Sequence, residues 1–207
     1  MKRILIYVML AVVFLLSGCK SDTVSAPDQG ISLPDTALKP NEEDYLEVVI
    51  PQNMFGGKNK TAEDIKNGFD SMDAEQRAAV NTDVIVNPDG TATLILTPEQ
   101  CETCKNNLLV NKEWFGQETL GAALTEVKYE DESLSQIMLY VKEPEYSNAG
   151  AARSMASMAL AVNAGNYQVL CGVGADEWKV VITVINHESG EVISQTEYPN
   201  DTMYDAQ

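Results

Sequence analysis

The sequence predicts an α+β domain in which helices cover one face of a mostly antiparallel sheet. Three observations support this prediction. Three strand–turn–strand patterns recur along the chain, a helical pattern precedes each of them, and one further strand comes first. The expected order is therefore one strand and then helix, strand, strand three times over, with three helices in all. We expect residues 44–199 to form this domain, because the length suits one domain or at most two small ones.

The domain should begin with a strand at 45–50, which Pro51 ends. Met54 and Phe55 follow in a glycine-rich turn, where they could form an exposed binding tip or tuck under the domain. A helix then begins after Thr61, an N-cap residue followed by acidic residues in the first turn. Its apolar residues recur on one helical face at Ile65, Phe69, Met72 and Val80.

The first hairpin joins strands at 83–86 and 91–96. In its turn Pro88 presets one φ and Gly90 accepts a positive φ. The second helix should run to about residue 115. It opens with an N-cap, a proline at the first helical position and a capping-box glutamine, which are Thr97, Pro98 and Gln100.

The second hairpin joins 124–129 to 134–141, and the third joins 178–185 to 191–198. Between them a third helix covers about 147–171, with Gly172 as its C-cap. Its stripe of small residues and methionines could form a Met-rich groove or a dimer face, but we favour a central buried helix. The stripe consists of Ala151, Met155, Met158, Val162, Gly165 and Val169.

The start of the chain has the pattern of a bacterial export signal. Two basic residues precede an uncharged apolar run at 4–16, which is short for a transmembrane helix of about 20 residues. The run ends in Leu16-Ser17-Gly18-Cys19, which resembles the bacterial lipobox. The resemblance implies that residues 1–18 are cleaved and that Cys19 carries a diacylglyceryl group. The alternative is an uncleaved N-terminal anchor with an incidental cysteine.

Residues 19–43 contain prolines among small polar residues and no helical or strand period, so we expect a lipidated flexible tether. Its root-mean-square reach would be about 25–30 Å. Two acyl chains anchor stably, because each buried CH₂ contributes about 0.8 kcal/mol. The domain should therefore lie at the extracytoplasmic face of the cell membrane, held through Cys19. Residues 200–207 should form a disordered tail.

Charge excludes one class of partner. The formal net charge is −17, and it becomes −19 when Lys2 and Arg3 leave with the signal, since residues 1–18 contain no acidic residue. Nucleic acids and anionic lipid surfaces repel such a domain, so we expect no nucleic-acid binding. A charged partner should present cationic groups, although the charge could also serve only to keep a tethered protein soluble.

Cys101-Glu102-Thr103-Cys104 is the one motif with a catalytic pattern. A CxxC pair at a helix start is used in thiol–disulfide exchange, so a surface oxidoreductase using Cys101 and Cys104 is the alternative function. The N-cap at Thr97 nevertheless places Cys101 at the fourth helical position, and Glu99 and Glu102 would raise a thiol pKa. A structural disulfide is a further possibility, because the cell exterior permits one.

The remaining candidates favour structural roles. Cys171 is most simply a buried small hydrophobic residue. Zinc ligation by Cys101, Cys104, Cys171 and His187 would use acceptable ligands, but His187 lies in a predicted hairpin turn. Because His187 is the only histidine, the sequence offers almost no candidate residues for the catalytic triad of a hydrolase. We expect no metal and no cofactor, and we attribute three acidic clusters to solvated turns instead of calcium sites. These clusters are Glu42–Asp44, Glu130–Glu132 and Asp176–Glu177.

Several segments together resemble a group of uncharacterised lipoproteins of Gram-positive (Firmicutes) bacteria. They are the lipobox at Cys19, Leu46–Pro51 leading to Phe55–Gly57, the Asn87–Gly90 hairpin, Tyr167–Gly172, and the closing hairpin Glu188–Ile193 to Tyr198–Pro199. The resemblance covers most of 44–199 and implies a cell-surface location and an α+β domain, but no activity. We therefore expect a non-enzymatic binding or interaction module with an unknown envelope protein or ligand as partner.

Overall fold

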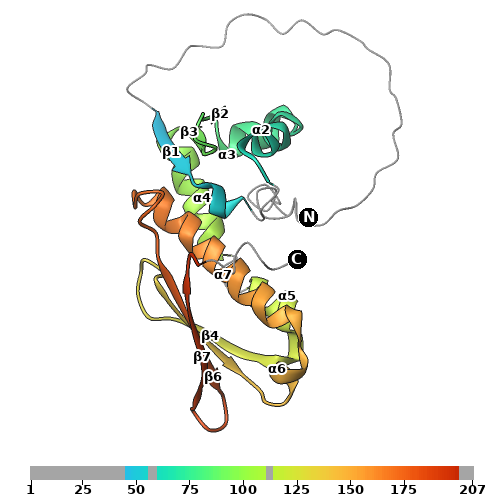
Figure 1. Ribbon diagram of the computed structural model, residues 1–207. Helices are drawn as coiled ribbons and strands as arrows, with labels where there is room; N and C mark the ends of the chain where they lie inside the picture. Colours follow the sequence, from blue (N-terminus) through green and yellow to red (C-terminus); the bar gives the residue numbers. More distant parts are fainter. Residues whose placement is uncertain (1–44, 56–59, 111–113, 201–207) are drawn as a thin grey trace, which may run out of the picture.

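The structure is a computed structural model that describes residues 45–55, 60–110 and 114–200 (Figure 1). Within these ranges the chain has six α-helices, two short 3₁₀ helices and seven strands, so the α+β prediction is confirmed. The strands form two sheets instead of one, and all pairs but one are antiparallel. The buried hydrophobic side chains of both sheets, apart from Ile185, belong to one continuous core.

The first sheet contains three antiparallel strands in the order β1-β3-β2. The strands are β1 (Leu46–Ile50), β2 (Asp83–Val86) and β3 (Ala92–Leu96). Val48 of β1 and Val84 of β2 both pair with Leu94 of β3, and all three side chains are buried. Because side chains alternate between the faces of a sheet, these residues define an inner face that meets the core.

The second sheet contains four strands in the order β4-β5-β6-β7. They are β4 (Leu124–Tyr129), β5 (Gln136–Val141), β6 (Val180–Asn186) and β7 (Val192–Tyr198). The central pair, β5 and β6, is parallel, with Leu139 opposite Val184 and both buried. Parallel neighbours need a long crossover, which here is the helical segment between β5 and β6.

All three predicted hairpins are present, as β2–β3, β4–β5 and β6–β7. The second hairpin differs slightly from the prediction, because β5 begins at Gln136 and not at Leu134. Leu134 has φ +58 in the turn, and its side chain is buried there. The predicted strand at 45–50 also forms, and its partner is β3.

The predicted order with three helices is not confirmed, because the described residues contain six helices and the first and third predicted helices are each divided in two. The helices are α2 (Ala62–Asp70), α3 (Ala74–Val80), α4 (Pro98–Val110), α5 (Trp114–Leu120), α6 (Glu145–Asn148) and α7 (Ala151–Leu170). A new N-cap at Asp73, which accepts a hydrogen bond from the Gln76 N–H at 2.8 Å, separates α2 from α3. Gly150, with φ +57, separates α6 from α7.

Helix α7 lies between the two sheets in Figure 1 and packs against β1, α4, α5 and β6. From Ala156 onward nearly every side chain is buried, as expected for a central helix, while Met155 is exposed and Met158 half-buried. Gly165 permits the closest approach, because a Cβ there would lie 2.6 Å from the Trp178 ring and 2.8 Å from Met54. Small residues on α7 therefore serve packing inside the core.

The residues after β1 also turn into the core. Gln52–Met54 form a 3₁₀ helix, η2, and both Met54 and Phe55 are buried. The alternative of an exposed binding tip is therefore wrong for these two side chains.

Candidate functional site

Several predicted features lie outside the described residues. These are the signal at 1–18, the lipidation site at Cys19, the tether at 19–43, the acidic residues 42–44 and the tail from 201 onward. The anchor therefore stays a prediction from the sequence. No helix in the described ranges is long and apolar enough to cross a membrane.

Cys101 and Cys104 lie on α4 with their sulfur atoms directed at different neighbours. The Cys101 thiol donates to the carbonyl oxygen of Leu170 at 3.6 Å, and the Cys104 thiol donates to that of Val80 at 3.4 Å. Both side chains are buried, and both are free thiols. Thr97 and Gln100 exchange the two hydrogen bonds of the predicted capping box, so Cys101 does stand at the fourth helical position.

Burial dominates the electrostatics of both thiols. Burial raises the pKa of Cys101, and Glu102 raises it further against the lowering effect of Lys105. Burial raises the pKa of Cys104 to about 12, with a smaller contribution from Cys101. Since the thiolate is the nucleophile in disulfide exchange, this environment does not favour a catalytic CxxC pair.

The zinc ligand set considered above is not assembled. Cys171 caps the end of α7 and is exposed, contrary to the expectation of a buried residue. His187 lies in the turn after β6, where its ring meets the edge of Tyr140 at 6.4 Å between centroids. The length of β6, about 20 Å for seven residues, separates the regions of the two side chains. Within the described ranges, no three His, Cys, Asp or Glu side chains are grouped to hold a metal ion.

The acidic turn at 130–132 has a structural role through one carboxylate. Asp131 accepts hydrogen bonds from the Ser135 and Gln136 N–H groups, both at 3.0 Å, and from the Ser133 and Ser135 hydroxyls. Burial acts to raise the pKa of Asp131, but these hydrogen bonds outweigh it and hold the pKa below its ordinary value. The hydrogen bonds of the turn between β4 and β5 thus account for the position of Asp131.

A groove opens beside β2, at the turn that joins α2 to α3. The sequence did not indicate it. Its volume is about 410 Å³, and both apolar and polar side chains line it. The lining residues are Phe69, Asp70, Ala74, Arg77, Ala78, Asn81, Thr82, Asp83 and Gln100. In the part of the chain that the structure describes, Arg77 makes no ion pair.

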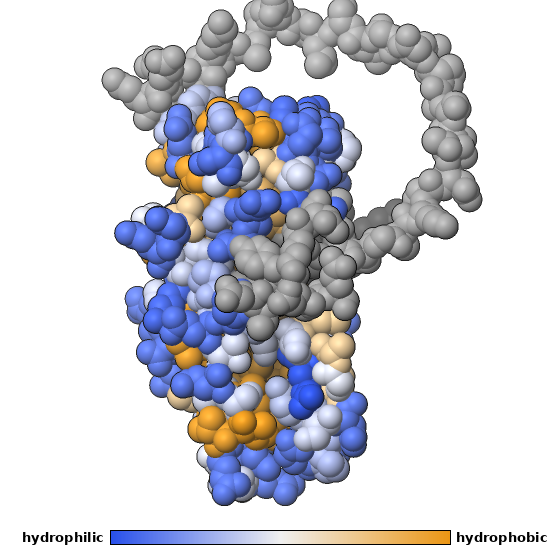
Figure 2. All heavy atoms as spheres, viewed as in Figure 1, coloured by the Kyte–Doolittle hydropathy of each residue, from blue (hydrophilic) through white to orange (hydrophobic). Residues whose placement is uncertain are grey.

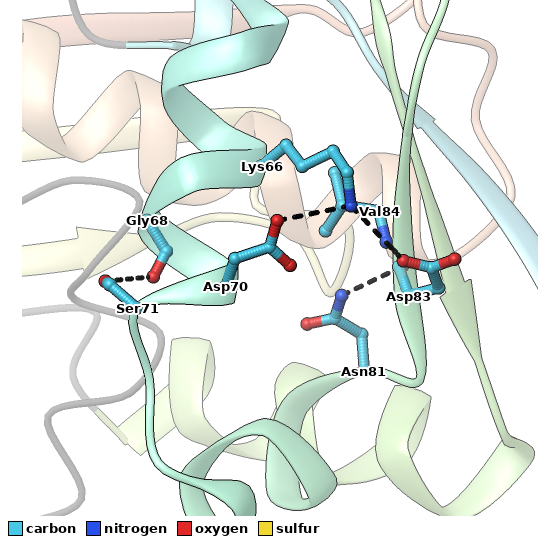
Figure 3. A network of polar contacts seen from close by, with 7 residues as sticks. All are labelled: Lys66, Gly68, Asp70, Ser71, Asn81, Asp83 and Val84. Carbon is cyan, nitrogen blue, oxygen red and sulfur yellow. Dashed lines mark hydrogen bonds and ion pairs between the residues drawn. The ribbon is translucent and has the colours of Figure 1, made fainter. Parts of the chain in front are cut away.

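A polar network holds one wall of this groove (Figure 3). Lys66 Nζ lies 3.4 Å from the Asp70 carboxylate and 3.7 Å from that of Asp83, so one cation joins α2 to β2. The Asn81 side chain donates to the Asp83 carbonyl oxygen at 3.0 Å, and the Asp83 carboxylate accepts from the Val84 N–H at 2.8 Å. These contacts order the junction between helix and strand, and the charge of Lys66 is balanced within it.

The face of the first sheet opposite the core carries exposed apolar side chains. We call it the outer face and define it by Val49, Thr93 and Ile85, which lie side by side on β1, β3 and β2, with Glu47 in the next row. Val49 is 39% exposed and Ile85 46% exposed, while Thr93 between them is buried. In Figure 2 hydrophobic atoms gather at the end of the molecule where Figure 1 has this sheet.

Comparison of the chain with protein-family models, with curated proteins and with solved structures gave no match. The resemblance to Gram-positive lipoproteins therefore stays a prediction. The outer face was missed by the sequence interpretation, although one signal was present. Val49 falls between the core residues Val48 and Ile50, and Ile85 follows the core residue Val84, at positions that a one-sided sheet would assign to polar residues.

Proposed function

We propose that the chain is a lipid-anchored protein at the extracytoplasmic face of the cell membrane, whose domain binds an envelope protein without catalysing a reaction. The sequence supports the anchor, since a basic start, an apolar run and small residues before Cys19 agree with one another. The outer face of the first sheet supports the binding role.

The apolar row on the outer face is the observation that carries the binding proposal. A one-sided antiparallel sheet normally presents polar residues to water, whereas Val49 and Ile85 present branched apolar side chains. Protein interfaces have apolar centres and polar rims, and Glu47 supplies an acidic rim here. Together with the strongly negative net charge, this arrangement fits a partner surface with an apolar centre and basic surroundings.

The anchor is tested by mass and fractionation. Full-length protein extracted from bacterial membranes should lack residues 1–18 and carry the added mass of a diacylglyceryl group on Cys19. A Cys19→Ala variant should lose both the processing and the lipid. Full-length protein that keeps residues 1–18 and carries no lipid would contradict the proposed location.

The binding surface is tested by site-specific photo-crosslinking in intact cells. A photoreactive amino acid at Ile85 should yield a defined adduct with an envelope protein. The matched control is the same amino acid at Val192, an exposed apolar position on a strand of the second sheet. Equal adduct patterns from the two positions, or none from Ile85, would contradict a role for the outer face. Buried thiols with raised pKa values weigh against the oxidoreductase alternative.

A further inference from the structure

The structure places two cysteines that are distant in sequence at one junction between helices. Cys101 lies in the first turns of α4, and Cys171 ends α7. The two helices pack against each other, and the Cys101 sulfur lies 3.6 Å from the carbonyl oxygen of Leu170. That carbonyl belongs to the peptide bond joining Leu170 to Cys171, so the two cysteines are spatial neighbours.

Both positions are fixed by regular backbone. The Cys171 N–H donates to the carbonyl oxygens of Tyr167 and Gln168 at 3.0 Å each. Gly172 then takes φ +94, and the Val173 N–H donates back to Gln168 at 3.0 Å, which is the pattern of a closed helix end. A disulfide requires Cα atoms about 4.4–6.8 Å apart with little backbone movement. The ordered helix end and the packing of α4 on α7 limit how far the Cys171 backbone can move relative to Cys101.

The two thiols differ in access in a way that suits stepwise oxidation. Cys171 is exposed and open to a reagent in solution, whereas Cys101 is 2% exposed. Cys104 is unsuited to this role, because its sulfur points to Val80 at the end of α3 and is 1% exposed. The CxxC spacing therefore does not identify the pair of cysteines that lie close to the one exposed thiol, Cys171.

Two further side chains complete the cluster. Lys105 lies one turn after Cys101 on α4 and pairs with Glu102 at 2.9 Å. The hydrogen bond with Glu102 raises the pKa of Lys105, and negative charge on Cys101 or Cys171 raises it further. Burial raises the pKa of Tyr167, and the neighbouring Cys171 raises it further. The charge of Lys105 thus acts on the Cys101 sulfur in the direction that favours a thiolate during exchange.

We propose that Cys101 and Cys171 form a disulfide when the protein meets a low-molecular-weight disulfide as oxidant. The Cys171 thiolate attacks one sulfur of the oxidant, forms a mixed disulfide and releases one thiol. The Cys101 sulfur then attacks the Cys171 sulfur and displaces the second thiol. Two protons and two electrons pass to the oxidant, which becomes two thiols. The product links α4 to α7, leaves Cys104 as a thiol, and does not depend on the proposed anchor.

The test uses the full-length protein, purified in detergent under reducing conditions and then exposed to oxidised glutathione. Remaining thiols are alkylated after an acid quench, and unreduced peptides are mapped by mass spectrometry after cleavage at glutamate. Because Glu102 lies between Cys101 and Cys104, this cleavage assigns each thiol separately, and it keeps Cys19 apart. We expect the thiols of Cys101 and Cys171 to be lost together, with one linked peptide pair and Cys104 still alkylated.

Two variants sharpen the result. Cys104→Ser should retain the link, while Cys171→Ser should leave Cys101 alkylated at every glutathione concentration. The inference is overturned if the wild-type protein links Cys101 to Cys104, if Cys171 stops at a stable glutathione adduct, or if both thiols persist in the oxidant. Equal circular dichroism spectra of the reduced wild-type and variant proteins confirm that folding is unchanged.

Discussion

Both sheets bury apolar side chains on one face, but they expose others at different places: the first sheet on its outer face, and the second at Val192 and Ile193 on β7. In the second sheet the central strands β5 and β6 bury Ile137, Leu139, Ile182 and Val184 under the helices. The first sheet is shorter, and it also leaves Val49 and Ile85 in water on its outer face. The difference teaches that apolar residues on a strand do not all serve stability. In the central strands of the second sheet they build the core, whereas on the outer face of the first sheet they remain in contact with water.

Truncation of one residue from each group should give the largest contrast. Leu139→Ala removes a fully buried side chain and leaves a cavity, so we expect the free energy of unfolding to fall by about 3 kcal/mol. Ile85→Ala on the outer face should cost only about 0.5 kcal/mol. Urea denaturation measures both values. Similar losses for the two variants would break the distinction, since Ile85 would then be a core residue in energetic terms.

Gly165 tests whether the two sheets share one core. Gly165→Ala places a Cβ against the Trp178 ring before β6 and against Met54 after β1, so overpacking should cost about 2 kcal/mol. Because α7 contacts both halves, circular dichroism and tryptophan fluorescence should report one coincident unfolding transition. Ser154→Ala, at an exposed position of the same helix, is the control and should change little. Two separate transitions would show that the sheets are independent.

The sequence predicted features that depend on local interactions, and it did not predict those that depend on distant ones. Every hairpin was predictable, because turn residues such as Pro88 and Gly90 act within a few positions. The division between α2 and α3 could also have been predicted, because Asp73 followed by Glu75 in the first turn is an N-cap pattern. These signals depend only on backbone conformation and on side chains close in the chain.

Pairings between distant segments could not be predicted in this way. Nothing local to β1 says that it pairs with β3, and nothing local to β5 says that β6 lies beside it in parallel. The candidate sites depend on those pairings: the outer face needs β1 beside β3, and the neighbourhood of Cys101 and Cys171 needs α4 packed on α7. The CxxC motif was visible in the sequence, but the direction of each sulfur was set by tertiary packing.

The hairpin turns of the two sheets can be compared by how much an aspartate in each turn stabilises the fold at different pH values. Asp131, in the β4–β5 turn, has a pKa below its ordinary value of 3.8, so its ionised form stabilises the folded state above that pH. This contribution is lost as pH falls through the lowered pKa. We expect Asp131→Asn to cost about 1 kcal/mol at pH 7 and almost nothing near pH 2. Denaturation at both pH values measures the difference.

The matched variant in the first sheet is Asp89→Asn. Hydrogen bonds from Thr91 lower the pKa of Asp89, but this carboxylate lies in a fully exposed turn. Solvent should replace most of what these bonds contribute, so the effect should be smaller than at Asp131 with the same direction of pH dependence. A larger effect at Asp89 would mean that the first sheet depends more on its turn than the second does.

The smallest expected effects concern the ion pairs that hold one edge of each sheet. Lys66 joins α2 to β2 through two carboxylates and is 34% exposed, whereas Lys179 pairs only with Glu197 at 2.8 Å and is 59% exposed. Exposed ion pairs contribute about 0–1 kcal/mol. We therefore expect Lys66→Gln to lower the free energy of unfolding by about 0.5 kcal/mol and Lys179→Gln by less.

Urea denaturation in low and high salt measures both, and added salt should shrink the Lys66 effect because the groove is open to solvent. A salt-independent loss at Lys66 would instead assign its role to the packing of its aliphatic stem between α2 and β2.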